Sequence, residues 1–292
     1  MKRLIPLLLC VILVLALPVT ARADTGPKPS VNITVEGLPE GVTCYGTLLS
    51  KTESTGPATA YDGINDYYYG DEALRWVWEV FVGYEDPDGF YYLQEHWDCS
   101  GGSFRWGYYP PSTFKVLLYF PQTGTFVASD VLERYAFDSY YTVSLSGLDI
   151  SAVTPGETLE AEKSYDFTWE LISLAARVLI TIAVELAIAL VFGYRQKNQL
   201  LFLGILNVVT QVLLNAALNY VNYTSGQFAF VFWYVVLELA VFTIEAVVCW
   251  EWLPRHTEKK LRRGLVVLYA LVANVASFAV GLWLATVIPG IF

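Results

Sequence analysis

Four polar residues that could do chemistry interrupt long apolar stretches in the C-terminal half of the chain. Two are carboxylic acids and two are amides: Glu185, Asn207, Glu245 and Asn274. If each stretch is a helix rising ~1.5 Å per residue, all four lie roughly 10 to 15 Å from the same end of the bundle. Ionisable groups inside a membrane are costly and often functional. The sequence therefore predicts one polar layer as a candidate intramembrane site.

Several interpretations of this layer stay open. Two carboxylates at one depth repel each other, so one could stay protonated, or a cation could lie between them while the amides complete an oxygen cage. The layer could also be structural, because buried amides and carboxyls join membrane helices by hydrogen bonds. A lipid or another small ligand could bind there as well.

A second polar layer is predicted farther along the same stretches. It consists of Arg177, Asn215 and Glu238, at roughly 21 to 26 Å by the same rise per residue. Arg177 and Glu185 are eight residues apart, which places them on one helix face. We expect Arg177 and Glu238 to neutralise each other.

The stretches that carry these residues are long enough to cross a membrane. Each exceeds or matches the ~20 residues that span a ~30 Å hydrocarbon core. Their approximate limits are 167–192, 200–220, 228–250 and 265–288. Residues 167–292 are therefore predicted to form a four-helix transmembrane bundle, with the lipid bilayer as its surroundings.

The first 23 residues have the pattern of a signal peptide. Lys2 and Arg3 precede an apolar stretch, and Ala-Arg-Ala at 21–23 has the small-x-small form of a cleavage site. The alternative is one more, uncleaved membrane helix. Export would place residues 24–166 outside the cytoplasm.

Loop charge predicts the same orientation. Basic residues occur in the loops after the first and third stretches, whereas the loop at 221–227 has none. The basic loop residues are Arg195, Lys197, Arg255, Lys259, Lys260, Arg262 and Arg263. Since cytoplasmic loops carry the excess of Lys and Arg, we predict a multi-pass plasma-membrane protein whose residues 24–166 and C-terminus are extracytoplasmic.

Residues 24–166 are predicted to be a β-rich domain. Val31, Ile33 and Val35 alternate with polar residues, as in a half-buried strand. Further strands are expected at 43–51, 90–97, 104–109, 113–120, 125–129 and 140–145. Apolar residues recur at helical spacing only at 74–81. The fold class is thus a multi-domain membrane protein with a sandwich-like β domain that includes one helix.

Three consecutive tyrosines, Tyr67, Tyr68 and Tyr69, lie in a polar loop of this domain. Three neighbouring side chains cannot all point into a core, so they are a candidate platform for an external ligand. The alternative is that the tyrosines of this domain fill strand faces, where aromatic residues are favoured.

Two cysteines of the exported domain, Cys44 and Cys99, could form a disulfide. An oxidising compartment permits the bond, but two cysteines in a domain of this size are weak evidence for it. No cysteine spacing indicates a metal site.

The exported domain is strongly acidic. Residues 24–166 carry 22 acidic and 7 basic side chains, a net charge of −15. Such a domain repels nucleic acid and attracts cations or basic partners. Asp86, Asp88, Gly89 and Glu95 match part of a calcium loop, but Tyr84 occupies the first ligand position, so the pattern favours a turn.

Enzyme motifs are poorly represented. The only histidines are His96 and His256, and neither lies in an apolar stretch. No nucleophile elbow, phosphate loop or cofactor motif is present. Glu185 and Glu245 could act as an acid–base pair inside the membrane, so an enzyme stays open, but the pattern favours a protein without catalysis or cofactor.

Three segments resemble a group of exported, membrane-anchored proteins of Gram-positive bacteria. They are TLLSK at Thr47–Lys51, YYPPSTFKVLLYFP at Tyr108–Pro121 and ERYAFDSYYTV at Glu133–Val143. The resemblance implies a β-rich extracytoplasmic domain followed by four membrane helices, and location in the Gram-positive cell envelope. It implies no catalytic residue.

Two functions follow from this organisation. We expect an envelope-facing binding, sensing or interaction protein, whose exported domain contacts an envelope ligand or a protein partner. The alternative is a small ion- or proton-coupled transporter, or a transport subunit, that uses the intramembrane Glu/Asn layer. Four helices are few for a transporter, so the alternative requires a homo-oligomer or a partner membrane subunit.

Overall fold

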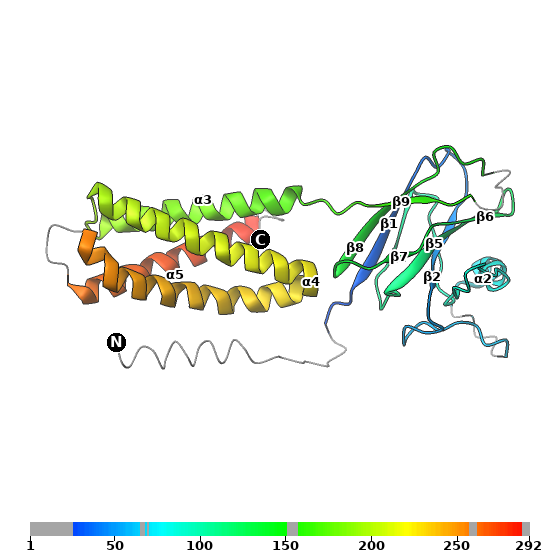
Figure 1. Ribbon diagram of the computed structural model, residues 1–292, viewed down its shortest axis with the longest axis horizontal. Helices are drawn as coiled ribbons and strands as arrows, with labels where there is room; N and C mark the ends of the chain where they lie inside the picture. The colour runs from blue at the N-terminus through cyan, green and yellow to red at the C-terminus, as the bar shows by residue number, and fades with distance from the viewer. Residues whose placement is uncertain (1–25, 65–67, 69, 151–156, 257–261, 288–292) are drawn as a thin grey trace. The chain divides into compact units, whose positions relative to one another are not determined.

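The computed structural model describes residues 26–64, 68, 70–150, 157–256 and 262–287 (Figure 1). The predicted signal peptide lies outside the described residues. The chain divides into a β-rich unit, Pro27–Tyr165, and a helical unit that begins at Asp166.

Two sheets form the β-rich unit (Figure 1). The first has the order β4-β1-β8-β9, with β1 and β8 parallel and the other pairs antiparallel. Its strands are β1 Ser30–Glu36, β4 Ser103–Trp106, β8 Asp138–Ser144 and β9 Glu160–Lys163. The second has the order β3-β2-β5-β6, and β7 also pairs with β5. Its strands are β2 Tyr45–Ser50, β3 Trp97–Asp98, β5 Thr113–Phe120, β6 Thr125–Ala128 and β7 Leu132–Glu133.

Strand β5 is buried on both of its faces. Val116 and Leu118 join the core shared with β1, β4 and β8, to which the alternating residues of β1 contribute their apolar side. Leu117 and Tyr119 face the opposite way and pack under α2, Arg75–Val82. The apolar run of β5 thus supports two layers, a sheet on one side and a helix on the other.

Helix α2 forms where the apolar spacing predicts it. A short 3₁₀ turn, η1 Glu72–Leu74, leads into the helix, and the Asp71 side chain accepts a hydrogen bond from the Ala73 backbone N–H at 3.0 Å. Val77, Trp78 and Phe81 are buried against the second sheet.

The strand predicted at 90–97 is wrong. Tyr91 makes only an isolated bridge with Ser50, and regular pairing is limited to the short strand β3. Gln94 has a φ of 64°, in the left-handed region, which no regular strand accommodates. The highly charged strand β9 and the two-residue strand β7 were not predicted.

Among the described residues, three helices of the helical unit are long and apolar enough to cross a membrane, and not the four predicted. They are α3 Thr168–Val191, α4 Lys197–Trp252 and α5 Arg263–Val287, and a 3₁₀ turn, η2 Leu253–His256, follows α4. Each of the three helices packs against the other two. Helix α4 runs through both central stretches because the connection at 221–227 is itself helical; only Gly226, with φ 80° and ψ 176°, leaves helical geometry.

Helix α4 folds back on itself at Gly226. Thr210 donates a hydrogen bond to Glu245, 35 residues later in the same helix. A straight helix would separate these residues by about 50 Å. The two arms of α4 therefore lie side by side, as Figure 1 shows.

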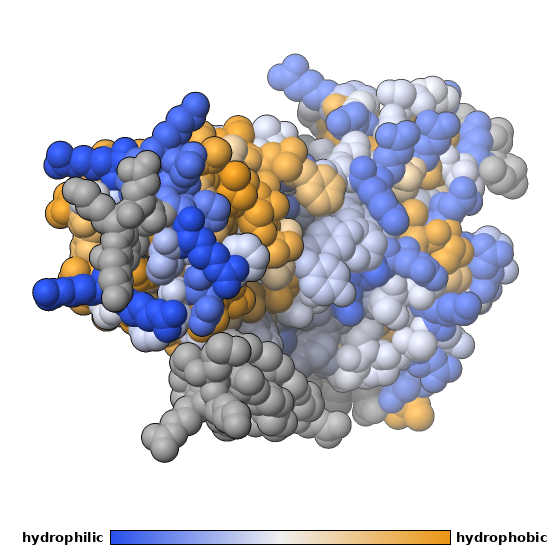
Figure 2. All heavy atoms as spheres, turned by 60° about the vertical axis from the view of Figure 1, so that its left-hand side comes forward, coloured by the Kyte–Doolittle hydropathy of each residue, from blue (hydrophilic) through white to orange (hydrophobic). Residues whose placement is uncertain are grey.

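The outer surface of the helical unit is apolar. Leu179, Val191 and Leu213 are 68, 84 and 66% exposed. Figure 2 shows apolar atoms along the side of this unit and hydrophilic side chains at its end. Such a surface is compatible with a multi-pass membrane protein.

Candidate functional site

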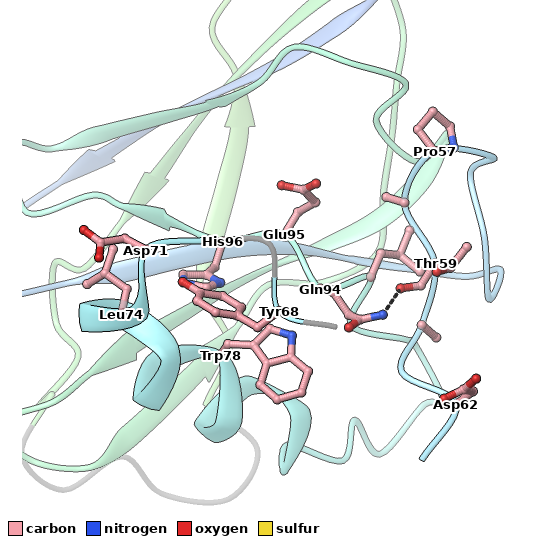
Figure 3. A pocket seen from close by; sticks show the side chains of 14 residues that line it. Pro57, Thr59, Asp62, Tyr68, Asp71, Leu74, Trp78, Gln94, Glu95 and His96 are labelled. Carbon is pink, nitrogen blue, oxygen red and sulfur yellow. Dashed lines mark hydrogen bonds between the residues drawn. The ribbon is translucent and has the colours of Figure 1, made fainter. Parts of the chain in front are cut away.

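A cavity of about 550 Å³ opens on the β-rich unit beside α2 (Figure 3). This volume is in the range of small-molecule binding pockets. Its polar and aromatic lining includes Asp62, Tyr68, Asp71, Trp78, Gln94, Glu95 and His96. These residues come from α2, from the segment before it and from two loops that are distant in the sequence.

Local structure explains how these segments meet. The left-handed backbone at Gln94 turns the chain, and Gln94 Nε2 donates a hydrogen bond to the Thr59 carbonyl at 3.0 Å. The dashed line in Figure 3 marks this link between the two loops. Asp71 caps the helical segment that presents Trp78. The irregular backbone that ends the predicted strand at 90–97 thus builds the cavity wall.

Trp78 has an unused hydrogen-bond donor in this wall. The residue is 4% exposed, and its Nε1 has no partner among the described residues. Tyr61 packs edge-on against the indole at a ring-centroid distance of 5.4 Å, and Tyr68 packs at 5.9 Å. In Figure 3 the indole nitrogen points toward the Gln94 side of the cavity. Burying a donor without a partner costs about 1–3 kcal/mol of desolvation free energy. A ligand that supplies an acceptor here would therefore be favoured.

Two aromatic groups of the lining are uncharged near neutral pH. Burial lowers the pKa of His96 to about 4, and its Nδ1 shares a hydrogen bond of 2.8 Å with the Tyr92 hydroxyl. Burial raises the pKa of Tyr68, and the carboxylates of Asp71 and Glu72 raise it further. The rings of Tyr68 and His96 stack at a centroid distance of 6.4 Å. The formal charge of the lining therefore comes from its carboxylates.

The tyrosine platform is described only in part. Tyr68 lines the cavity, whereas Tyr67 and Tyr69 lie outside the described residues. Their role as a platform stays a prediction. The helical spacing at 74–81 predicted a helix that contains Trp78 but no role for this residue in a site, and no pattern predicted a role for His96. Nothing in the sequence indicates that Trp78 and His96 line the same cavity.

Cys44 and Cys99 lie side by side in the core. Both are buried, their Sγ atoms are 2.7 Å apart, and the Cys99 backbone N–H donates to the Cys44 carbonyl at 2.8 Å. The disulfide stays a prediction.

Two acidic residues of the calcium-like pattern, Asp86 and Asp88, contact a lysine. Lys115 Nζ lies 3.0 and 3.1 Å from the two carboxylate oxygens of Asp86 and also contacts Asp88. Asp86 accepts hydrogen bonds from two backbone N–H groups of the turn that follows it. Burial by itself lowers the pKa of Lys115, but the hydrogen bonds to the two carboxylates outweigh burial and raise it. The turn interpretation is confirmed.

The predicted inner layer comes together within the helical unit. Glu185, Asn207, Glu245 and Asn274 are all buried. Glu245 accepts hydrogen bonds from Thr210 Oγ1 at 2.5 Å and from Asn274 Nδ2 at 2.7 Å. These contacts join both arms of α4 to α5.

The outer-layer residues Arg177, Asn215 and Glu238 line one small cavity of about 10 Å³, room for roughly one water molecule. The Arg177 Nε also donates to the Ser173 carbonyl at 3.3 Å. The neutralisation of Glu238 by Arg177 stays a prediction.

Comparison with known proteins places the chain in no family. No protein-family model, no curated protein and no solved structure matches it significantly. The resemblance to Gram-positive envelope proteins therefore stays an expectation, and the proposals below rest on the geometry of the two sites.

Proposed function

We propose that this chain is a membrane-anchored binding protein of the bacterial cell envelope. Its β-rich unit would bind a ligand outside the cytoplasm, and its apolar helices would hold that unit at the membrane. The supporting observation is the cavity of about 550 Å³ whose wall contains the buried, unpartnered Nε1 of Trp78.

The proposed orientation rests on the signal-peptide pattern and on loop charge. The two arms of α4 would cross the membrane separately, which gives four spans with the turn at Gly226 outside. Both Ser225 and Arg195 are exposed, so labelling of a cysteine at either position depends on the side of the membrane on which it lies. An impermeant maleimide should therefore label Ser225→Cys in intact cells but not Arg195→Cys. Labelling of only Arg195→Cys would show that the protein has the opposite orientation.

The lining of the cavity favours a hydroxyl-rich ligand of the saccharide class. The carboxylates of Asp62, Asp71 and Glu95 accept hydrogen bonds, whereas Trp78 Nε1 donates one. A hydroxyl group can donate to a carboxylate and accept from the indole. The rings of Tyr68 and Trp78 add apolar surface for the C–H face of a sugar.

Other ligand classes fit the lining less well. An anion would be repelled by the carboxylates of the cavity and by the net charge of −15 on residues 24–166. A simple amine would pair with the carboxylates but leave the Trp78 donor without an acceptor.

Saturation-transfer NMR on the full-length protein in detergent tests this function. The panel would contain neutral hexoses, N-acetylated amino sugars and their short oligomers, with a sugar phosphate and an alkylamine as comparison ligands. We expect transfer to at least one neutral saccharide and none to the phosphate. Transfer only to the amine, or to no member of the panel, would contradict the proposal.

A further inference from the structure

The two buried carboxylates of the helical unit meet at a single turn of α5. Asn274 Nδ2 donates to Glu245 Oε2 at 2.7 Å, and three residues later Ser277 Oγ donates to Glu185 Oε1 at 3.3 Å. The two carboxyl groups are close enough to interact electrostatically. This cluster is separate from the ligand cavity of the β-rich unit and has no part in the function proposed above.

The cluster brings together acidic side chains that have no basic partner among the described residues. Within the described residues, no ion pair joins Glu185 or Glu245 to a lysine, arginine or histidine. Glu238, in the second arm of α4, adds a third nearby carboxyl group. A basic group, Arg177, lines the outer cavity with Glu238. Two unneutralised carboxylates in an apolar bundle would be strongly unfavourable.

The amides present oxygen atoms that lack a donor. Asn207 Nδ2 donates to the Leu203 carbonyl at 3.0 Å, and Asn274 Nδ2 donates to Glu245 and to the Ala270 carbonyl. Both Oδ1 atoms are buried and have no hydrogen-bond partner among the described residues. Asn207 and Asn274 are only 1 and 6% exposed. Asn215 Oδ1 in the outer layer is buried without a partner as well, so Asn207 and Asn274 are distinguished by their contacts with the two carboxyl groups.

A polar path leads away from the cluster. Ser277, the donor to Glu185, also lines the water-sized cavity of the outer layer. Gln211 and Thr181 line the same cavity. Polar groups therefore continue from the carboxylate pair to the outer layer.

We propose that Glu185, Glu245, Asn207 and Asn274 bind a metal cation that prefers oxygen ligands. Carboxylate and amide oxygens are the ligands of such cations, and positive charge would neutralise the carboxylates and satisfy both amide oxygens. Na⁺, K⁺, Mg²⁺ and Ca²⁺ share this ligand preference, and the experiment distinguishes them.

The test is thermal unfolding of the full-length protein in detergent at fixed pH and ionic strength. Each of the four cations replaces N-methylglucamine, an organic cation much larger than any of them. We expect one of them to raise the Tm saturably, by roughly 5 °C at about 100 times its Kd. The Glu185→Gln/Glu245→Gln variant should lose this rise. Asn207→Leu should weaken it, whereas Asn215→Leu, which changes a buried amide of the outer layer, should retain it.

Several outcomes would overturn the proposal. If the Tm of the wild-type protein is the same in all four cations and in N-methylglucamine, the site does not exist. This result does not depend on any variant being able to fold. A rise that persists in the double glutamine variant places the cation elsewhere. Trp78→Phe should leave the cation effect intact, so failure of the saccharide proposal and failure of this one can be told apart.

Discussion

The Thr210 hydroxyl donates a hydrogen bond to Glu245 Oε1 at 2.5 Å, although 35 residues of one helix separate the two residues. The contact is possible because Gly226 adopts φ 80° and ψ 176° and reverses the direction of α4. This backbone conformation is essentially restricted to glycine. The polar layer of the helical unit therefore depends on one glycine far from it in the sequence.

Gly226→Ala should destabilise the helical unit, because a Cβ is strained in this conformation. We expect a loss of about 1–3 kcal/mol, measured as a lower thermal midpoint in detergent. Gly204→Ala is the matched control, since Gly204 lies within α4 with open space around it. Alanine there should be neutral or stabilise by up to about 1 kcal/mol. Equal effects of the two substitutions would argue against the role of Gly226.

Lys115→Met should destabilise the β-rich unit by about 3–5 kcal/mol, because the buried Asp86 carboxylate would lose its cation. Chemical denaturation followed by near-ultraviolet circular dichroism would measure the loss. Lys163→Met changes an exposed lysine that lies over the Tyr135 ring and should change stability by less than about 1 kcal/mol. A small effect at Lys115 would mean that the Asp86 carboxylate is satisfied without it.

Acidification should destabilise the β-rich unit through His96. Its pKa is about 4 in the folded protein, below the usual 6.5, so the unfolded chain binds more protons between these values. Stability is therefore full above pH 6.5 and falls as the pH decreases toward 4, by about 1–2 kcal/mol after allowance for partial exposure. His96→Phe should flatten this part of the stability curve. If the stability curves of the wild type and of His96→Phe were parallel between pH 4 and 6.5, His96 would not be the group responsible.

Cys44 and Cys99 should be joined in protein isolated from an oxidising compartment. Alkylation under denaturing conditions without reductant should then modify Cys249 but neither of these two, as mass spectrometry of the peptides would show. Reductant should lower the Tm of the wild type, because a disulfide restricts the unfolded chain, and leave a Cys44→Ser/Cys99→Ser variant unchanged. Alkylation of Cys44 and Cys99 together with Cys249 would show that the pair is reduced.

Local patterns predicted several regular elements of this fold, but not β7 or β9. The alternation at Val31, Ile33 and Val35 predicted strand β1, and the helical spacing at 74–81 predicted helix α2. The positive φ of Gln94 left no comparable signal in the sequence, so a strand was predicted where the cavity wall lies. In the helical unit, counting the helical rise predicted that the inner-layer residues share a depth, but a periodic pattern could not show that α4 continues through 221–227.

The cavity was harder to predict than the polar layer. Polar residues stand out in an apolar stretch, whereas Trp78 and His96 lie among many aromatic residues and meet only through tertiary packing. Burial of Trp78 was foreseeable from its helical spacing. The missing partner of its Nε1 depends on every neighbouring atom, and no sequence pattern records that.

The most direct test of the binding function compares Trp78→Phe with Trp76→Phe in full-length protein. Trp78→Phe removes the buried donor and retains an aromatic ring, whereas Trp76, 43% exposed on the same helix, packs against Tyr45. Calorimetric titration with the saccharide identified by NMR gives each Kd. We predict that Trp78→Phe weakens binding by roughly tenfold or more and that Trp76→Phe leaves it unchanged. Wild-type affinity in Trp78→Phe, or equal losses in both variants, would contradict a saccharide site in this cavity.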